Sequence, residues 1–235
     1  MYKIKHFIIL LVFTTFVYAQ SKVITPLDCK KGELLFSDDF ERENIDDKWQ
    51  IKEKFTNAFY IDKGTLVAKE LKNAGHGSVA RALFSFSDVI IEFDLMFNGA
   101  NRLNIVMDDS LCKSVWAGHI SRISFNKKGF KVQDDKTGTM NLEIRDKIKD
   151  NPKKKLELKE FLNSKLSEAK MVFEEGKFYH VVITKKEDIL ECKIGDVIAQ
   201  IKSEGIMHPT LNKFGPTVIG DTIAFDNFKI WEIKE

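Results

Sequence analysis

The sequence contains few cysteines, which cross-link many small exported domains, and few prolines. Its 235 residues include only three cysteines and four prolines. The cysteines, Cys29, Cys112 and Cys192, allow at most one disulfide bond, which excludes a scaffold held together mainly by disulfides. Their spacing also matches no zinc ribbon or Cys-x-x-Cys motif, so we expect small buried side chains with at least one unpaired thiol.

Long apolar segments are absent after the first twenty residues. Lys3 and Lys5 precede an apolar run at 7–17, and small residues precede Gln20, which together are the three parts of a secretory signal peptide. The run has about 11 residues, well short of the ~20 that a membrane-spanning helix needs. We therefore expect removal of residues 1–19 and an exported, periplasmic or extracellular protein with no membrane anchor.

An excess of charge of one sign is also absent. Removal of Lys3 and Lys5 would leave 35 basic against 35 acidic residues. A neutral chain argues against a nucleic-acid partner. The alternative to a cleaved signal peptide is a lipoprotein anchored through Cys29. A cysteine that carries a lipid requires a small residue before it, and here that residue is Asp28.

Most of the chain alternates apolar and polar residues in short runs, which is the period of half-buried antiparallel strands. The 19 phenylalanines against four tyrosines are consistent with an aromatic core between two sheets. We predict an all-β, two-sheet antiparallel sandwich. Its clearest predicted strands are 64–69, 89–97, 102–107, 120–126, 178–185, 189–194, 197–203 and 222–231.

One segment departs from the strand pattern. Residues 142–171 are dense in lysine and glutamate, with Leu156, Phe161 and Leu166 near helical spacing. This pattern predicts a surface helix region inserted between strands. The expected organisation is a signal peptide at 1–19, a lead-in at 20–32 and a single sandwich domain at 33–233 that carries the insertion.

Two terminal motifs resemble those of a known superfamily. Residues 34–49, LLFSDDFERENIDDKW, and 220–231, GDTIAFDNFKIW, resemble the opening and closing strands of concanavalin A-like jelly rolls, in which the termini pair. Together with His208 to Thr210, Gly215 and Asp226-Asn227, they resemble bacterial exported proteins near the 3-keto-disaccharide hydrolase domain family. The resemblance implies a jelly roll whose concave sheet holds a sugar. Glucanases, polysaccharide lyases, keto-sugar hydrolases and lectins share that fold, which does not choose among them.

Several common catalytic motifs are missing. Glucanases of this superfamily carry Glu-x-Asp-x-x-Glu on one strand, because retaining hydrolysis needs two carboxyl groups about 5 Å apart. Here Glu92 and Asp94 are followed by Phe97, so the acid of the pair is absent. Ser78 follows Gly-His-Gly but lacks the strand-to-helix context of a nucleophile elbow. Phosphate-binding loops and zinc-protease motifs are absent as well.

The densest polar region is 117–141, where polar residues interrupt strand sequence. We predict that it forms a saccharide site with residues near the other end of the chain. The candidates for base and acid are His119, His208 and Asp135. The candidates for binding substrate oxygens or neutralising developing charge are Arg122, Lys136 and Lys213. Residues 134–138 are also ordinary turn residues, so the alternative of a simple reversal stays open.

Further candidates surround this region. Trp116 is a stacking platform for a sugar ring, and His76 stands in a glycine turn. Asn104 and Asp108 share one face of a predicted strand and could meet His119 across neighbouring strands. Residues three apart on a strand point to opposite faces, so His119 and Arg122 would need a bulge in order to share one.

The function that these features favour is cleavage of a glycosidic bond in a saccharide or polysaccharide, by hydrolysis or by elimination. The alternatives are a non-catalytic, lectin-like glycan-binding module and a structural envelope protein without a ligand. The superfamily resemblance also implies a structural calcium ion, with Asp38, Asp39 and Asp226 as its candidate ligands.

Overall fold

The computed structural model describes residues 24–234, so the predicted signal peptide lies outside the described residues. The strands are β1 (Lys30–Asp38), β2 (Gln50–Ile51), β3 (Phe59–Asp62), β4 (Thr65–Ala68), β5 (Ser78–Arg81), β6 (Val89–Asp108), β7 (His119–Asn126), β8 (Gly129–Asp134), β9 (Leu166–Lys170), β10 (Phe178–Lys186), β11 (Ile189–Ile194), β12 (Val197–Lys202) and β13 (Lys213–Lys234). The helices are α1 (Leu142–Asp150), α2 (Lys154–Glu157) and α3 (Lys159–Ser164), with 3₁₀ turns η1 (Glu53–Ala58), η2 (Trp116–Gly118) and η3 (Glu204–Met207).

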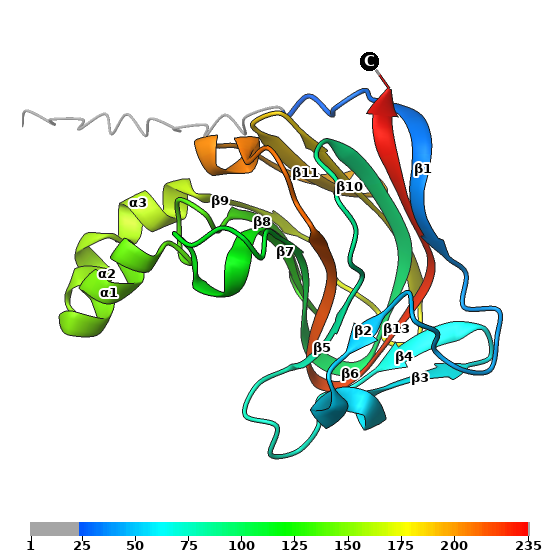
Figure 1. The fold of residues 1–235 in the computed structure, drawn as a ribbon. Helices are drawn as coiled ribbons and strands as arrows, with labels where there is room; N and C mark the ends of the chain where they lie inside the picture. Colours follow the sequence, from blue (N-terminus) through cyan, green and yellow to red (C-terminus); the bar gives the residue numbers. More distant parts are fainter. Residues whose placement is uncertain (1–23, 235) are drawn as a thin grey trace, which may run out of the picture.

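Two long strands, β6 and β13, form a spine that belongs to both sheets (Figure 1). They pair antiparallel along almost their whole length and bend together in the middle. Gly99 and Gly220 lie at the bend with φ angles of 98° and 93°, and the pairing register shifts beside them. Because L side chains rarely adopt such angles, these glycines allow the turn from one sheet into the other.

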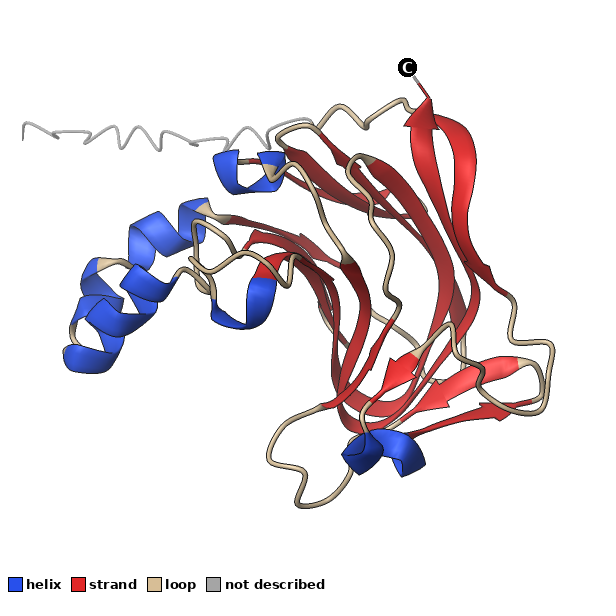
Figure 2. Ribbon diagram, viewed as in Figure 1, coloured by secondary structure: helices blue, strands red, loops and turns tan. Residues whose placement is uncertain are grey.

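The spine divides its partners between the two sheets (Figure 2). In the first sheet, β10 pairs with the start of β6, β11 and β12 follow, and β1 pairs with the end of β13. In the second sheet, β7, β8 and β9 extend from the end of β6, while β5 and β2 extend from the start of β13. The β3–β4 hairpin pairs with β13 at the bend. The predicted two-sheet antiparallel sandwich is confirmed.

Side-chain alternation explains where the core lies. Leu103, Ile105 and Met107 of β6 are fully buried between the sheets, whereas Asn104 and Asp108 belong to the opposite face of the same strand. The first half of β6 follows the same rule, with its apolar residues in the core and its acidic residues outside. Phenylalanines from both sheets fill the centre, and each fully buried one stabilises the fold by roughly 1.5–3 kcal/mol.

The structure corrects two of the predicted boundaries. Residues 89–97 and 102–107, expected as separate strands, are parts of the single bent strand β6. The helical insertion ends at Ser164, because 166–170 form strand β9 beside β8 rather than the end of a helix. Helices α1 to α3 contain no buried residue, in agreement with a surface insertion.

No helix between residues 24 and 234 is both long enough and apolar enough to cross a membrane. The three cysteines are all unpaired. Cys192 is fully buried in the core, as predicted, and burial raises the pKa of its thiol well above the ordinary value. Cys29 and Cys112 are only partly buried, so the expectation of small buried side chains holds for one cysteine of three.

The three predicted calcium ligands, Asp38, Asp39 and Asp226, each accept hydrogen bonds from other groups of the protein. Asp38 accepts hydrogen bonds of 2.5 and 2.8 Å from Arg42 and one of 2.7 Å from the indole of Trp49. The charge of this buried carboxylate is balanced by the Arg42 guanidinium. Asp39 and Asp226 accept hydrogen bonds from nearby backbone N–H groups, and residues 24–234 contain no group of three potential ligands placed to hold a metal ion.

Replacing Asp38 with asparagine is expected to lower the free energy of unfolding at neutral pH by about 1–3 kcal/mol. Burial alone would raise the pKa of Asp38, but hydrogen bonds from Arg42 and Trp49 bring it below the ordinary value. Its contribution to stability is therefore present above the unfolded-state pKa of about 3.9 and is lost as pH falls through the lower folded-state pKa. Urea titrations from neutral to acidic pH should show a smaller acid-induced loss in Asp38→Asn than in the parent protein.

The exposed neighbour offers a matched control. Asp39→Asn should leave stability and its pH dependence almost unchanged, since Asp39 accepts only one long hydrogen bond at the surface. Equal effects of the two substitutions would contradict the role given to Asp38.

Candidate functional site

The second sheet bows so that its outward side is hollow, with α1 to α3 beyond one end and the loop before β5 beyond the other (Figure 1). We call this side the hollow face. Ladder pairing fixes its side chains, because directly paired residues point to the same face. Its rows are Thr217, Asn104 and Ser124; Gly215, Val106 and Arg122; and Lys213 beside Asp108.

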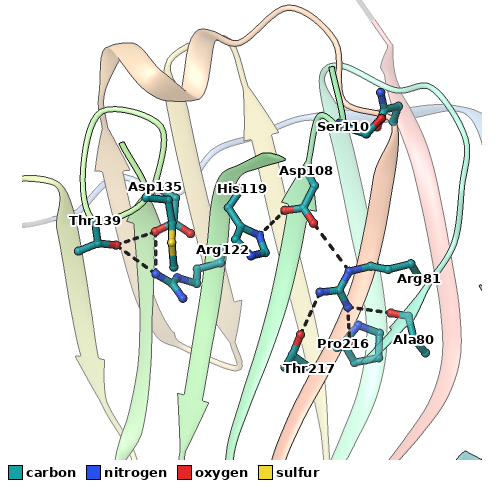
Figure 3. Close-up of polar contacts among 12 residues, drawn as sticks. Ala80, Arg81, Asp108, Ser110, His119, Arg122, Asp135, Thr139, Pro216 and Thr217 are labelled. Carbon is teal, nitrogen blue, oxygen red and sulfur yellow. Dashed lines mark hydrogen bonds and ion pairs between the residues drawn. The ribbon is translucent and has the colours of Figure 1, made fainter. Parts of the chain in front are cut away.

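His119 and Asp108 form the central contact of the hollow face (Figure 3). The regular register pairs Met107 with Ser121, but Asp108 then pairs with His119, so one extra residue of β7 bulges between them. Residues three apart on a regular strand point to opposite faces. Because of the bulge, His119 points to the same face as Arg122. The predicted meeting of Asp108 with His119 is thereby found.

The geometry leaves one imidazole nitrogen available. Nδ1 of His119 lies 2.7 Å from Oδ1 of Asp108, and because a carboxylate only accepts, Nδ1 carries the proton and donates it. Nε2 forms no hydrogen bond within residues 24–234, and the side chain retains 20% of its accessible surface. The contact with Asp108 therefore fixes the orientation of the imidazole ring and leaves Nε2 without a partner among the described residues.

Arg81 holds Asp108 from the other side (Figure 3). Its Nε lies 3.7 Å from Oδ2 of Asp108, and its terminal nitrogens donate to the carbonyls of Ala80 and Pro216 and to the hydroxyl of Thr217. Burial lowers the pKa of Arg81 to about 10, with the Asp108 charge opposing that shift. Since the terminal nitrogens already have partners, Arg81 acts as a positioning residue for Asp108.

Arg122 is held by Asp135 and Thr139. One terminal nitrogen donates to Oδ1 of Asp135 at 2.8 Å and to the Thr139 hydroxyl at 3.1 Å, and Thr139 also donates to Asp135 at 3.0 Å. Asp135 is 0% exposed, and this burial raises the pKa of its carboxyl, against the lowering effect of Arg122 and His119. Asp135 thus lies enclosed in the protein and positions Arg122, while its role as a base or acid stays a prediction.

His208 belongs to a different cluster, so its predicted meeting with His119 is not found. Its Nε2 lies 2.8 Å from Asp109, and its Nδ1 lies 3.0 Å from the Lys136 ammonium. An ammonium can only donate, so Nδ1 accepts and Nε2 donates to Asp109. Burial would raise the pKa of Asp109, but the hydrogen bond from His208 and others lower it. With both ring nitrogens engaged, His208 and Lys136 link the loop after β8 to the end of β6.

The remaining candidates are dispersed. Asn104 accepts a hydrogen bond from Ser124 on the hollow face, and Lys213 is half-buried beside Asp108 with no ion-pair partner among residues 24–234. His76 lies in the loop before β5, against Lys54 and the Gly77 carbonyl, apart from the contacts of His119. Trp116 is 55% exposed in η2, next to the start of α1.

Two members of the site were not predicted, Arg81 and Thr139. Side chains alternate along β5, so Arg81 points to the same face as Val79, and Val79 pairs with Thr217 of the hollow face. The alternation of the sequence therefore indicated that Arg81 belongs to this face. Thr139 stands in a turn-rich segment, and only the folded loop brings its hydroxyl to Arg122.

The sequence matches no protein-family profile and no curated protein. Solved structures are similar in fold. The laminarinase from Rhodothermus marinus aligns over 86% of this chain and 98% of its own, with 11% identity and a TM-score of 0.57. LamA_E269S from Z. galactanivorans, solved in complex with laminaritriose and laminaritetraose, aligns over 86% of this chain and 100% of its own, with 11% identity and a TM-score of 0.52.

The carbohydrate-binding module CBM66 from Bacillus subtilis aligns over 79% of this chain and 96% of its own, with 14% identity and a TM-score of 0.51. At such identities the likeness shows the fold and not the activity. The protein therefore has a concanavalin A-like jelly-roll fold, which it shares with glycoside hydrolases and with carbohydrate-binding modules.

Proposed function

We propose that the protein is an exported carbohydrate-active enzyme that cleaves a glycosidic bond on the hollow face, with His119 as the base. The observation that carries the proposal is the His119–Asp108 contact, which leaves Nε2 unpaired on the hollow face of a saccharide-processing fold. Asp108 fixes the tautomer and the ring orientation, which is the standard way to prepare an imidazole for proton transfer. Export rests on the N-terminal sequence pattern alone.

Elimination suits these groups better than retaining hydrolysis. The carboxyls nearest to His119, Asp108 and Asp135, are both buried, so neither can serve as the nucleophile of a double displacement. In elimination, His119 would take a proton from the carbon next to a carbonyl or carboxylate. The electrons of that C–H bond form a C=C bond as the C–O bond to the neighbouring sugar breaks. The departing oxygen then takes up a proton from water, and the protonated His119 returns its proton to the solvent.

Cations beside His119 fit the same reaction. Proton removal next to a carbonyl places negative charge on the carbonyl oxygen, and preorganised donors at that point lower the barrier. Arg122 and Lys213 flank the Asp108–His119 pair on the hollow face and can supply them. The resemblance to the 3-keto-disaccharide hydrolase family supports including sugars with a ring ketone among the substrates tested.

A product screen tests the proposal. The purified protein would be incubated with neutral, 3-keto, uronic-acid and sulfated oligosaccharides, and the products would be read by mass spectrometry. Elimination yields two fragments whose masses sum to that of the substrate, whereas hydrolysis adds the mass of one water. Absence of products from every class would overturn the proposed enzymatic function.

The second candidate is a glycan-binding module that uses the same region without cleavage. The exposed indole of Trp116 favours it, because aromatic platforms stack on sugar rings. Saturable binding of an oligosaccharide with no change in its mass would decide for this candidate.

A further inference from the structure

A cavity of about 530 Å³ lies between Trp116 and the inserted helices. We call it the helix-side cavity. Its wall combines apolar side chains from both sides with charged side chains from α1 and α2, and consists of Trp116, Thr139, Leu142, Arg145, Asp146, Ile148, Lys149, Lys155 and Leu162. The volume is in the range of about 300–1,000 Å³ that is usual for small-ligand sites.

The backbone holds Trp116 at this cavity in a constrained turn. Val115 pairs with Asn141, and the Trp116 N–H donates to the Met140 carbonyl at 2.8 Å, which ties the turn to the start of α1. Ala117 has a φ of 55°, an unusual value for a residue other than glycine. The exposed indole of Trp116 thus stands beside a strained residue, and residues with such strain are found more often at functional sites than elsewhere.

The charge of the cavity wall is mostly positive and uncompensated. Arg145, Lys149 and Lys155 stand against the single carboxylate of Asp146. No ion pair engages any of these three cations within residues 24–234, although neighbouring helical residues do pair with one another. The Arg145 guanidinium lies 5.0 Å from the ring centre of Trp116, and one of its terminal nitrogens contacts the sulfur of Met140 at 3.6 Å. These two contacts hold the guanidinium at the cavity wall.

The helix-side cavity adjoins the groups around His119 through one residue. Thr139 lines the cavity and also donates to Asp135 and accepts from Arg122. A chain of sugar rings could therefore place one ring against Trp116 and the next at His119. This placement rests on the proposed function of the hollow face.

We infer that the helix-side cavity binds an anionic sugar unit, a uronic acid or a sulfated sugar, of the glycan that is cleaved at His119. A pyranose ring offers an apolar face to Trp116 and Leu142, while its carboxylate or sulfate faces Arg145 and Lys149. Arginine binds such planar or tetrahedral oxyanions through two parallel N–H groups, and lysine adds a point charge. The substrate class is therefore an acidic polysaccharide rather than a neutral glucan.

Binding measurements on the His119→Ala protein, which should leave the glycan intact, test this inference. Oligosaccharides of one length in neutral, uronic-acid and sulfated forms would be titrated by calorimetry at low and high salt. We expect at least one anionic form to bind about tenfold more tightly than the neutral form, with the advantage shrinking as salt screens the charges. Preference for the uronic acid or for the sulfate identifies which oxyanion the cavity takes.

Substitutions on α1 distinguish binding inside the cavity from a general attraction of anions to the surface charge. Arg145→Gln and Lys149→Gln should each remove most of the anionic preference, whereas Lys147→Gln, on the same helix but outside the cavity wall, should keep it. Equal affinity for neutral and anionic forms, or unchanged affinity in Arg145→Gln, would overturn the inference. If either result is obtained and the unsubstituted protein still cleaves neutral glycans, the proposed function stands and only the anionic specificity of the cavity is refuted.

Discussion

His119→Ala is expected to reduce glycan cleavage by about 10²–10⁴-fold while the protein keeps its fold and its affinity for the glycan. The substitution removes the unpaired Nε2 together with the hydrogen bond from Nδ1 to Asp108, while the backbone of β7 retains its pairing. Initial rates from product masses, together with calorimetric affinity, would separate the lost proton transfer from lost binding. Asp108→Asn should also slow cleavage, because an amide no longer fixes the reactive tautomer.

A second histidine supplies the control. His180 is exposed on the outer face of the other sheet, where it contacts Asp94, so His180→Ala should retain the cleavage rate of the parent protein. Parent-like turnover in His119→Ala would refute the assignment of the base. Loss of folding in that variant, detected by circular dichroism, would shift the test to His119→Gln.

Phe228→Ala should destabilise the fold by about 3–5 kcal/mol. Phe228 is fully buried and packs against aromatic rings from several elements, among them Phe93 at a centroid distance of 4.7 Å and Trp49 at 5.4 Å. Truncation would leave a cavity where β6, β13 and the N-terminal loop meet. Urea unfolding followed by tryptophan fluorescence would report the change directly, because Trp49 lies in the same cluster.

The matched control is Phe161→Ala on α3, a ring that is 43% exposed on a helix with no buried residues. Its loss should cost well under about 1 kcal/mol. Similar effects of the two truncations would mean that the aromatic cluster is not the main source of stability.

The sheets were predictable from the sequence because the alternation of side chains is a local property. Residues 120–126, 178–185 and 189–194 show it clearly, and each is a strand within a residue or so of the expected bounds. The pairing of the termini followed from the resemblance of the end motifs. The continuous strand β6 was not predictable, since Gly99 and the polar residues around it look like a loop until β13 is known to bend alongside them.

The site was less predictable because it depends on register across strands. Asp108 and His119 meet only through a bulge that moves every later residue of β7 by one position, and a pattern of residue types does not reveal a bulge. Burial was the other missing information. The sequence shows Asp135 as a polar loop residue, whereas the fold encloses it completely under Arg122 and Thr139.

The shared spine also bears on how the chain folds. In the second sheet β6 joins β13, whose residues lie far along the sequence, so the long-range loop must close before that pairing forms. Neither sheet can therefore separate from the other by local opening, and the sandwich should unfold as one cooperative unit. The His119 side chain should accordingly stay in place until the whole protein unfolds, and the backbone amides of β7 should exchange only through global unfolding.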